Sequence, residues 1–113
     1  MTNGERAAEA DQVLNALGDG TRRAMFGLLA QSPASVSVLA EATGVTKTAV
    51  GQHIAVLEAC QLVTSQKTGR VRICKIDQRG LNVLQRWIED HRGHWESNLG
   101  SLESLLGEGD RNR

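Results

Sequence analysis

The sequence predicts a mainly α-helical domain with one small β-hairpin, in the order α-α-α-α-β-β-α. Apolar residues recur at steps of three and four in five segments, which is the spacing of a buried helix face. Two short segments, residues 62–66 and 71–76, look extended, and a turn that contains glycine joins them. At 113 residues, the chain is long enough for one domain with a modest core.

Two helices are expected before residue 32, separated by the segment Gly18-Asp19-Gly20. Asp19 or Thr21 can cap the second helix by accepting a bond from a backbone N–H group. Pro33 disfavours helix at the residue before it, so residues 32–34 are expected to form a linker. The expected organisation is a disordered N-terminus over residues 1–6, one domain over residues 7–106, and a loose tail over residues 107–113.

Residues 35–62 predict two further helices joined by a tight turn at Gly44, with Thr46 as the cap of the later helix. One face of that later helix is apolar, and the other carries donors and acceptors but no carboxylate. Such a face suits the major groove of DNA, where side chains meet base edges and phosphates. The pattern indicates a helix-turn-helix, and an ordinary helical hairpin with a solvated face is the alternative. The apolar face comprises Ala49, Val50, Ile54 and Leu57, and the polar face Lys47, Thr48, Gln52 and His53.

The predicted hairpin has a basic tip, because its turn is expected to be Lys67-Thr68-Gly69-Arg70. A basic hairpin directly after a helix-turn-helix is typical of the wing of a winged-helix domain, and Lys67 and Arg70 can reach phosphates or the minor groove. A solvated turn is the alternative. The chain has a formal net charge of zero, but residues 46–76 hold five basic residues against one acidic residue, a net charge of +4.

A single long helix is expected over residues 78–106, with an apolar stripe that runs from Leu81 to Leu106. A helix of this length extends beyond a core of this size, so its stripe needs a partner. The simplest partner is the same helix of a second subunit.

The chain from Val13 to Leu106 resembles the ArsR/SmtB-type family of bacterial transcriptional repressors. The segments that carry the resemblance are LGDGTRRAMFGLLA, SVSVLAEATGVTKTAVGQHIAVLEACQLV and TGRVRICKID. The resemblance implies a homodimeric winged helix whose first and last helices form the dimer interface, and whose two recognition helices face successive major grooves of a palindromic operator. The chain departs from the family pattern at Gly20, Gly51 and Gln61. Because Gln61 stands where glycine usually ends the recognition helix, we expect this residue to have a positive φ.

The candidate residues follow from these patterns and from the resemblance. For contact with double-stranded DNA they are Thr46, Lys47, Thr48, Gln52, His53, Lys67, Arg70 and Arg72. For the dimer interface they are Val13, Leu14, Leu17, Leu84, Ile88, His91, Trp95, Leu99 and Leu102. His53 has two equally weighted interpretations, a DNA contact and a contact within the domain.

The sequence also bears on other functions. Residues 35–41 contain no cysteine, and His91 and His94 have no second ligand pair at the family's distance, so we expect no metal site and no other cofactor. Cys60 and Cys74 are a candidate redox pair for a thiol-responsive sensor, and two small buried hydrophobic residues are the alternative. A pocket near Trp87, His91 and Trp95 would suit a small-ligand effector. A protein-interaction module that has lost DNA binding is a third interpretation.

The sequence contains no recognisable set of catalytic residues, so we expect no enzyme. We expect a cytoplasmic location with no membrane association, because neither an export signal nor a long apolar run is present.

Overall fold

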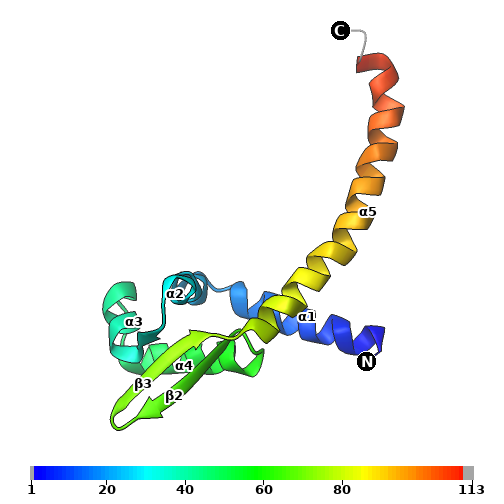
Figure 1. Ribbon diagram of the computed structural model, residues 1–113. Helices are drawn as coiled ribbons and strands as arrows, with labels where there is room; N and C mark the ends of the chain where they lie inside the picture. The colour runs from blue at the N-terminus through cyan, green and yellow to red at the C-terminus, as the bar shows by residue number, and fades with distance from the viewer. Residues whose placement is uncertain (1, 111–113) are drawn as a thin grey trace.

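The structure is a computed structural model that describes the backbone of residues 2–110 and the side chains of residues 2–93. It confirms the predicted fold class, a winged helix with five helices and a small antiparallel sheet (Figure 1). The elements are α1 (Asn3–Leu17), α2 (Gly20–Gln31), β1 (Ala34–Ser35), α3 (Val36–Thr43), α4 (Lys47–Ala59), β2 (Val63–Thr68), β3 (Val71–Ile76) and α5 (Gln78–Asp110).

Strand β1 is absent from the sequence prediction, which places residues 32–34 in a linker. Ala34 pairs with Cys74 and Ser35 pairs with Ile73, so the sheet has three strands in the order β1-β3-β2. Ser35 also caps α3, because its hydroxyl accepts a hydrogen bond from the backbone N–H of Val38 at 3.1 Å. Two residues are too few to show an alternating pattern, so only the pairing with β3 reveals this strand.

The helix caps agree with the sequence at α2 and α4, where Asp19 and Thr46 are the N-caps. The start of α1 differs from the prediction. The helix begins at Asn3 instead of Ala7, because the hydroxyl of Thr2 accepts a hydrogen bond from the backbone N–H of Glu5 at 3.1 Å. Residues 3–6, expected to be disordered, therefore form the first turn of α1, and the acidic side chain of Glu5 suits the positive end of the helix dipole.

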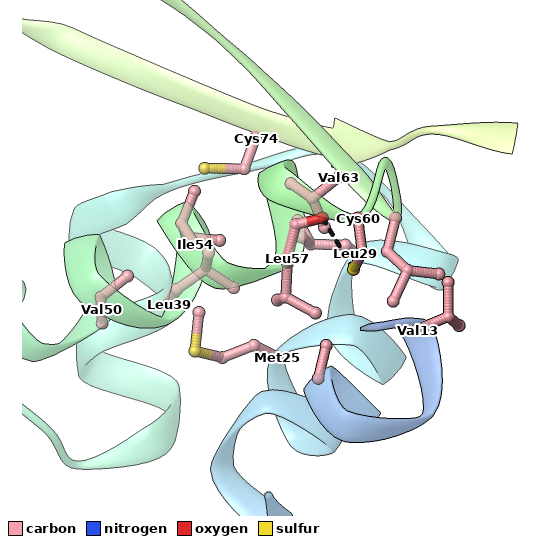
Figure 2. Close-up of a cluster of buried hydrophobic side chains, with 12 residues drawn as sticks. Val13, Met25, Leu29, Leu39, Val50, Ile54, Leu57, Cys60, Val63 and Cys74 are labelled. Carbon is pink, nitrogen blue, oxygen red and sulfur yellow. Dashed lines mark hydrogen bonds between the residues drawn. The ribbon is translucent and has the colours of Figure 1, made fainter. Parts of the chain in front are cut away.

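The core lies where α1, α2, α3 and α4 meet the inner face of the sheet (Figure 2). Leu57 lies near the centre of this cluster and is fully buried. Aliphatic and sulfur-containing side chains make up the buried cluster, in keeping with the low aromatic content of the chain. Its buried members are Val13, Ala16, Met25, Leu29, Leu39, Val50, Ile54, Leu57, Cys60, Leu62, Val63 and Cys74.

A sharp corner connects α4 to β2, and Gln61 there has a φ of 62°. This confirms the positive φ expected at that position. Helix α5 packs tightly against the corner, since the backbone N–H of Gly80 donates to the carbonyl oxygen of Gln61 at 2.7 Å. The N–H of Asp77 donates to the carbonyl oxygen of Leu62 at 2.9 Å. The corner therefore fixes the point from which α5 leaves the domain.

Replacing Gln61 by glycine is expected to raise the free energy of unfolding, by up to about 1 kcal/mol. Non-glycine residues pay roughly 1–2 kcal/mol in the left-handed region, and the greater freedom of glycine in the unfolded chain offsets part of that gain. Urea denaturation at one fixed protein concentration measures the change. A less stable Gln61→Gly variant would mean that the glutamine side chain makes a stabilising contact that outweighs the backbone strain.

Helix α5 extends well beyond the core (Figure 1). The chain spans 67 Å along its longest axis, and its radius of gyration is 19.2 Å, compared with about 13 Å for a compact domain of this length. Among the residues of α5 whose side chains the structure describes, those that pack on the core are Leu81, Val83 and Leu84, all in its first turns. Within the described residues, no helix has both the length and the apolar character needed to cross a membrane.

Candidate nucleic-acid interface

Helix α4 presents an exposed polar face opposite its buried face. Val50 and Ile54 point into the core, whereas Thr48 and Gln52, one turn apart, lie on the far side and are exposed. Lys47 is exposed in the first turn. These three side chains offer hydrogen-bond donors and acceptors and one positive charge, which is the chemistry that meets base edges and phosphates in a major groove. Thr46 faces solvent as well, but its hydroxyl caps the helix by accepting from the backbone N–H of Ala49 at 3.1 Å.

His53 differs from the rest of the predicted polar face because it is half-buried and contacts α2. Its Nδ1 atom lies 3.5 Å from Nη1 of Arg22. Arginine can only donate, so Nδ1 of His53 is the acceptor in this contact. The structure thus supplies the contact within the domain that was one of the two interpretations of His53.

Arg22, in α2, connects this helix to α1 and α4 through its side chain. The sequence pattern does not indicate this role. Its Nε atom donates to the carbonyl oxygen of Ala16 at 2.7 Å, which satisfies the C-terminal end of α1. Its backbone N–H donates to Asp19 Oδ1 at 3.0 Å, and this bond lowers the pKa of the Asp19 carboxyl group. The contribution of Asp19 to stability is therefore present above its usual pKa and is lost as the pH falls through the lowered value.

The wing is a β2–β3 hairpin whose turn is shorter than predicted. Thr68 pairs with Val71, so the loop comprises Gly69 and Arg70 alone, and Lys67 lies within β2 opposite Arg72. Gly69 has a φ of 63° at the first loop position, where a two-residue turn of type II′ needs glycine. The side chains of Lys67, Arg70 and Arg72 are all exposed at this end of the hairpin. In Figure 1 the tip lies at the α3 end of the domain, away from the corner where α4 leads into β2.

Arg72 is tied to the domain through two further polar residues. Its Nη1 atom donates to the hydroxyl of Ser65 at 2.8 Å, and that hydroxyl donates to Oε1 of Glu58 at 2.6 Å. Glu58 belongs to α4, Ser65 to β2 and Arg72 to β3. Sequence reasoning predicted a phosphate contact for Arg72 and missed both partners. Strand alternation places Arg72 and Cys74 on the same face of β3, and Ser65 joins that face because it pairs with Cys74. This alternation is the sequence feature that could have indicated the contact.

Comparisons with known proteins agree with this architecture. A family model described as a helix-turn-helix domain matches residues 17–66. The chain is 40% identical over 75 residues to the helix-turn-helix-type transcriptional regulator Rv2034 of Mycobacterium tuberculosis (strain ATCC 25618 / H37Rv), covering 66% of this chain and 70% of the relative. A crystal structure of an ArsR family transcriptional regulator, RHA00566, is 33% identical with a TM-score of 0.74, covering 80% of this chain and 94% of that one. The chain belongs to the ArsR family of transcriptional regulators.

The fold of this ArsR-family regulator is also similar to that of a more distant solved structure. It is the homodimeric winged helix-turn-helix DNA-binding domain of Mb0332 from Mycobacterium bovis, which is 24% identical with a TM-score of 0.63 and covers 95% of this chain and 93% of that one. Of the departures from the family pattern, Gly51 lies on the exposed face of α4 with no atom within 4 Å of where a Cβ would stand. The exposed face of α4 therefore has open space and no side chain at Gly51.

The two cysteines of this regulator are free and buried, and they do not have the features of a redox pair. Burial raises the pKa of the Cys60 thiol and that of the Cys74 thiol, which disfavours the reactive thiolate in both. Figure 2 shows the two sulfurs well apart, that of Cys74 beside Ile54 and that of Cys60 toward Leu29. The structure favours the alternative interpretation, in which both cysteines are small hydrophobic residues of the core.

The predicted dimer interface of this ArsR-family regulator requires one correction. Val13 is 1% exposed in a single subunit, so it is a core residue with no surface left for a partner. Ile88, in contrast, is 46% exposed on α5, and His91 is exposed with its ring stacked on Trp87 at 4.2 Å between centroids. Leu14, Leu17 and Leu84 are half-buried. The side chains of Trp95, Leu99 and Leu102 lie outside the described residues.

A groove of about 500 Å³ separates the start of α1 from α5 in this regulator. Arg6 and Asp11 line its α1 side, and Trp87, Asp90 and His91 line its α5 side. His91 is held in place because its Nδ1 atom donates to the carbonyl oxygen of Trp87 at 2.8 Å. Within residues 2–93, no three His, Cys, Asp or Glu side chains gather in a way that could hold a metal ion. A small-ligand effector in this groove stays a prediction.

Proposed function

We propose that this ArsR-family regulator is a cytoplasmic homodimer that binds a two-fold symmetric DNA operator and represses transcription. The observation that carries the proposal is the outer face of α4. Its exposed residues Lys47, Thr48 and Gln52 are polar or basic, and none of them is acidic. The exposed basic residues of the wing tip, which lies at the α3 end of the domain, support the same role. The homodimeric state of Mb0332 and the exposed apolar side chain of Ile88 on α5 support the dimer.

The residues of the interface divide into two roles. Lys47, Lys67 and Arg70 provide positive charge for phosphates, which supplies affinity without sequence preference. Thr48 and Gln52 lie in the first turns of α4, the part of a recognition helix that contacts base edges. Two copies of α4 related by a two-fold axis would face half-sites about one helical turn apart, roughly 34 Å.

Alanine substitutions are expected to separate the two roles. The double variant Thr48→Ala with Gln52→Ala should lose about 1–3 kcal/mol of discrimination between operator and random duplex at each base pair that these side chains contact. Arg70→Ala should weaken binding to both duplexes alike, and it should reduce the slope of log affinity against log salt by about one. Fluorescence anisotropy over a salt series measures both effects.

The matched control for Arg70→Ala is Arg86→Ala, which removes the same charge from an exposed position on α5. The control should keep the salt slope of the native protein. An unchanged slope for Arg70→Ala would remove the wing from the interface. Failure of the native protein to bind random duplex at low salt would favour an interaction module that has lost DNA binding.

A further inference from the structure

Three polar residues form a hydrogen-bonded chain that joins the wing to α4. Arg72 in β3 donates from Nη1 to the hydroxyl oxygen of Ser65 in β2 at 2.8 Å. The same hydroxyl donates to Oε1 of Glu58 in α4 at 2.6 Å. A serine hydroxyl has one proton to donate and lone pairs to accept with, so Ser65 can join the guanidinium to the carboxylate. Both bonds involve a charged partner, which makes them stronger than bonds between neutral groups.

The hydrogen bonds that link Glu58, Ser65 and Arg72 lie where the hairpin leaves the body of the domain. On the inner face of the hairpin, Val63 and Cys74 are buried in the core and Ser65 is half-buried. Beyond Ser65, the residues of β2 are exposed. The charges of Glu58 and Arg72 act in opposite directions on the pKa of Cys74, the strand partner of Ser65, so both charges lie near this one point.

Strand β1 pairs with β3 only at Cys74 and Ile73, so the hairpin has two strands beyond these residues. A hairpin of two strands is only marginally stable in water, and this outer part needs contacts beyond its own pairing to fix its angle to α4. We propose that Glu58, Ser65 and Arg72 are positioning residues that set the angle of the wing on the recognition helix. The wing tip and the outer face of α4 then meet DNA as one preorganised surface. Arg72 acts through Ser65 in this scheme, and its charge is compensated within the protein instead of on a phosphate. The inference rests on the DNA binding proposed above.

Ser65→Ala and Arg72→Ala are the first test. Each is expected to reduce operator affinity about tenfold, because the strained or mobile wing must be ordered on binding. The double variant should bind no more weakly than either single variant, since each change breaks the same chain. Hydroxyl-radical footprinting should show that the protected minor-groove positions beside each half-site are lost in all three. Ser65→Thr keeps the hydroxyl on a residue that suits a strand, and it should restore both affinity and footprint.

Glu58→Ala gives a second test whose direction separates positioning from simple charge. Removal of an acidic group beside the interface should strengthen DNA binding if only net charge matters. If Glu58 instead positions the wing, the Glu58→Ala variant should bind DNA more weakly than the native protein. The control is Glu41→Ala, which removes an exposed carboxylate from the neighbouring helix α3 and should bind as well as the native protein or better.

The outcomes distinguish this inference from the proposed function. If the native protein binds no DNA in a low-salt gel shift, the proposed function fails and the inference fails with it. If the native protein binds and Ser65→Ala binds equally well with an intact footprint, only the positioning chain is refuted. Additive losses in the double variant, with Arg72→Ala alone reducing the salt slope, would assign Arg72 to a phosphate. Thermal denaturation of each variant verifies that the domain is folded, and if Ser65→Ala is unfolded, Glu58→Ala decides the matter.

Discussion

Replacing Gly80 by alanine is expected to lower the free energy of unfolding by about 3 kcal/mol, the upper part of the usual range for overpacking. A Cβ atom at this position would stand 2.5 Å from the carbonyl oxygen of Gln61, 2.7 Å from its carbonyl carbon and 2.8 Å from the backbone nitrogen of Leu62. All three are backbone atoms, so no side chain can rotate away to make room. The hydrogen bond from Gly80 to Gln61 and the positive φ of Gln61 belong to the same corner, and both would be disturbed.

The matched control is Gly27→Ala in α2. Gly27 is exposed within a helix, and no atom lies within 4 Å of its would-be Cβ. This substitution should stabilise the protein by about 0.5–1 kcal/mol, because alanine has the higher helix propensity. Urea denaturation of both variants should be done at one protein concentration, since association contributes to apparent stability. Equal stability of Gly80→Ala and the native protein would show that α5 can shift away from the corner at no cost, and would contradict the tight junction described here.

The sequence predicts best the features that depend on neighbouring residues. The caps at Asp19 and Thr46 follow from side chains three positions from the backbone N–H groups that they accept from. The turn at Gly44 follows from glycine itself, which tolerates a φ of 75°. The periodic apolar residues locate α4 and separate its buried face from its exposed face. The positive φ of Gln61 follows from the family resemblance, because glycine usually stands at that place.

The features that the sequence does not reveal depend on contacts between distant segments. Gly80 reads as one more helix residue until α5 is placed against Gln61. Val13 matches the periodicity of an interface residue, but the packing of α1 on the rest of the core buries it. His53 shares the polarity of its neighbours, and only the approach of Arg22 from α2 assigns its Nδ1 atom. A one-dimensional pattern shows that a residue lies on a face, whereas the tertiary fold decides what covers that face.

Replacing Ile88 by glutamate is expected to dissociate the proposed dimer and to reduce affinity for a two-half-site operator by about 100-fold or more. Ile88 is 46% exposed in one subunit, so the change removes little from the core. In a dimer joined through α5, however, each subunit would bury a new carboxylate in an apolar seam, which is unfavourable without a partner charge. A monomer then binds each half-site independently, and the gain from a tethered second contact is lost.

Sedimentation velocity measures the mass of the variant, and anisotropy compares the complete operator with a single half-site. Ile88→Glu should bind the half-site about as well as the native protein does, because α4 and the wing are unchanged. The control is Asn82→Glu, which adds the same charge on another face of α5, where Gln78 already donates to the Asn82 side chain. That variant should remain dimeric. If Ile88→Glu stayed dimeric with native operator affinity, the face of α5 that carries Ile88 would have no part in association. Two α4 helices would then have to be spaced on DNA by a different surface of the subunit.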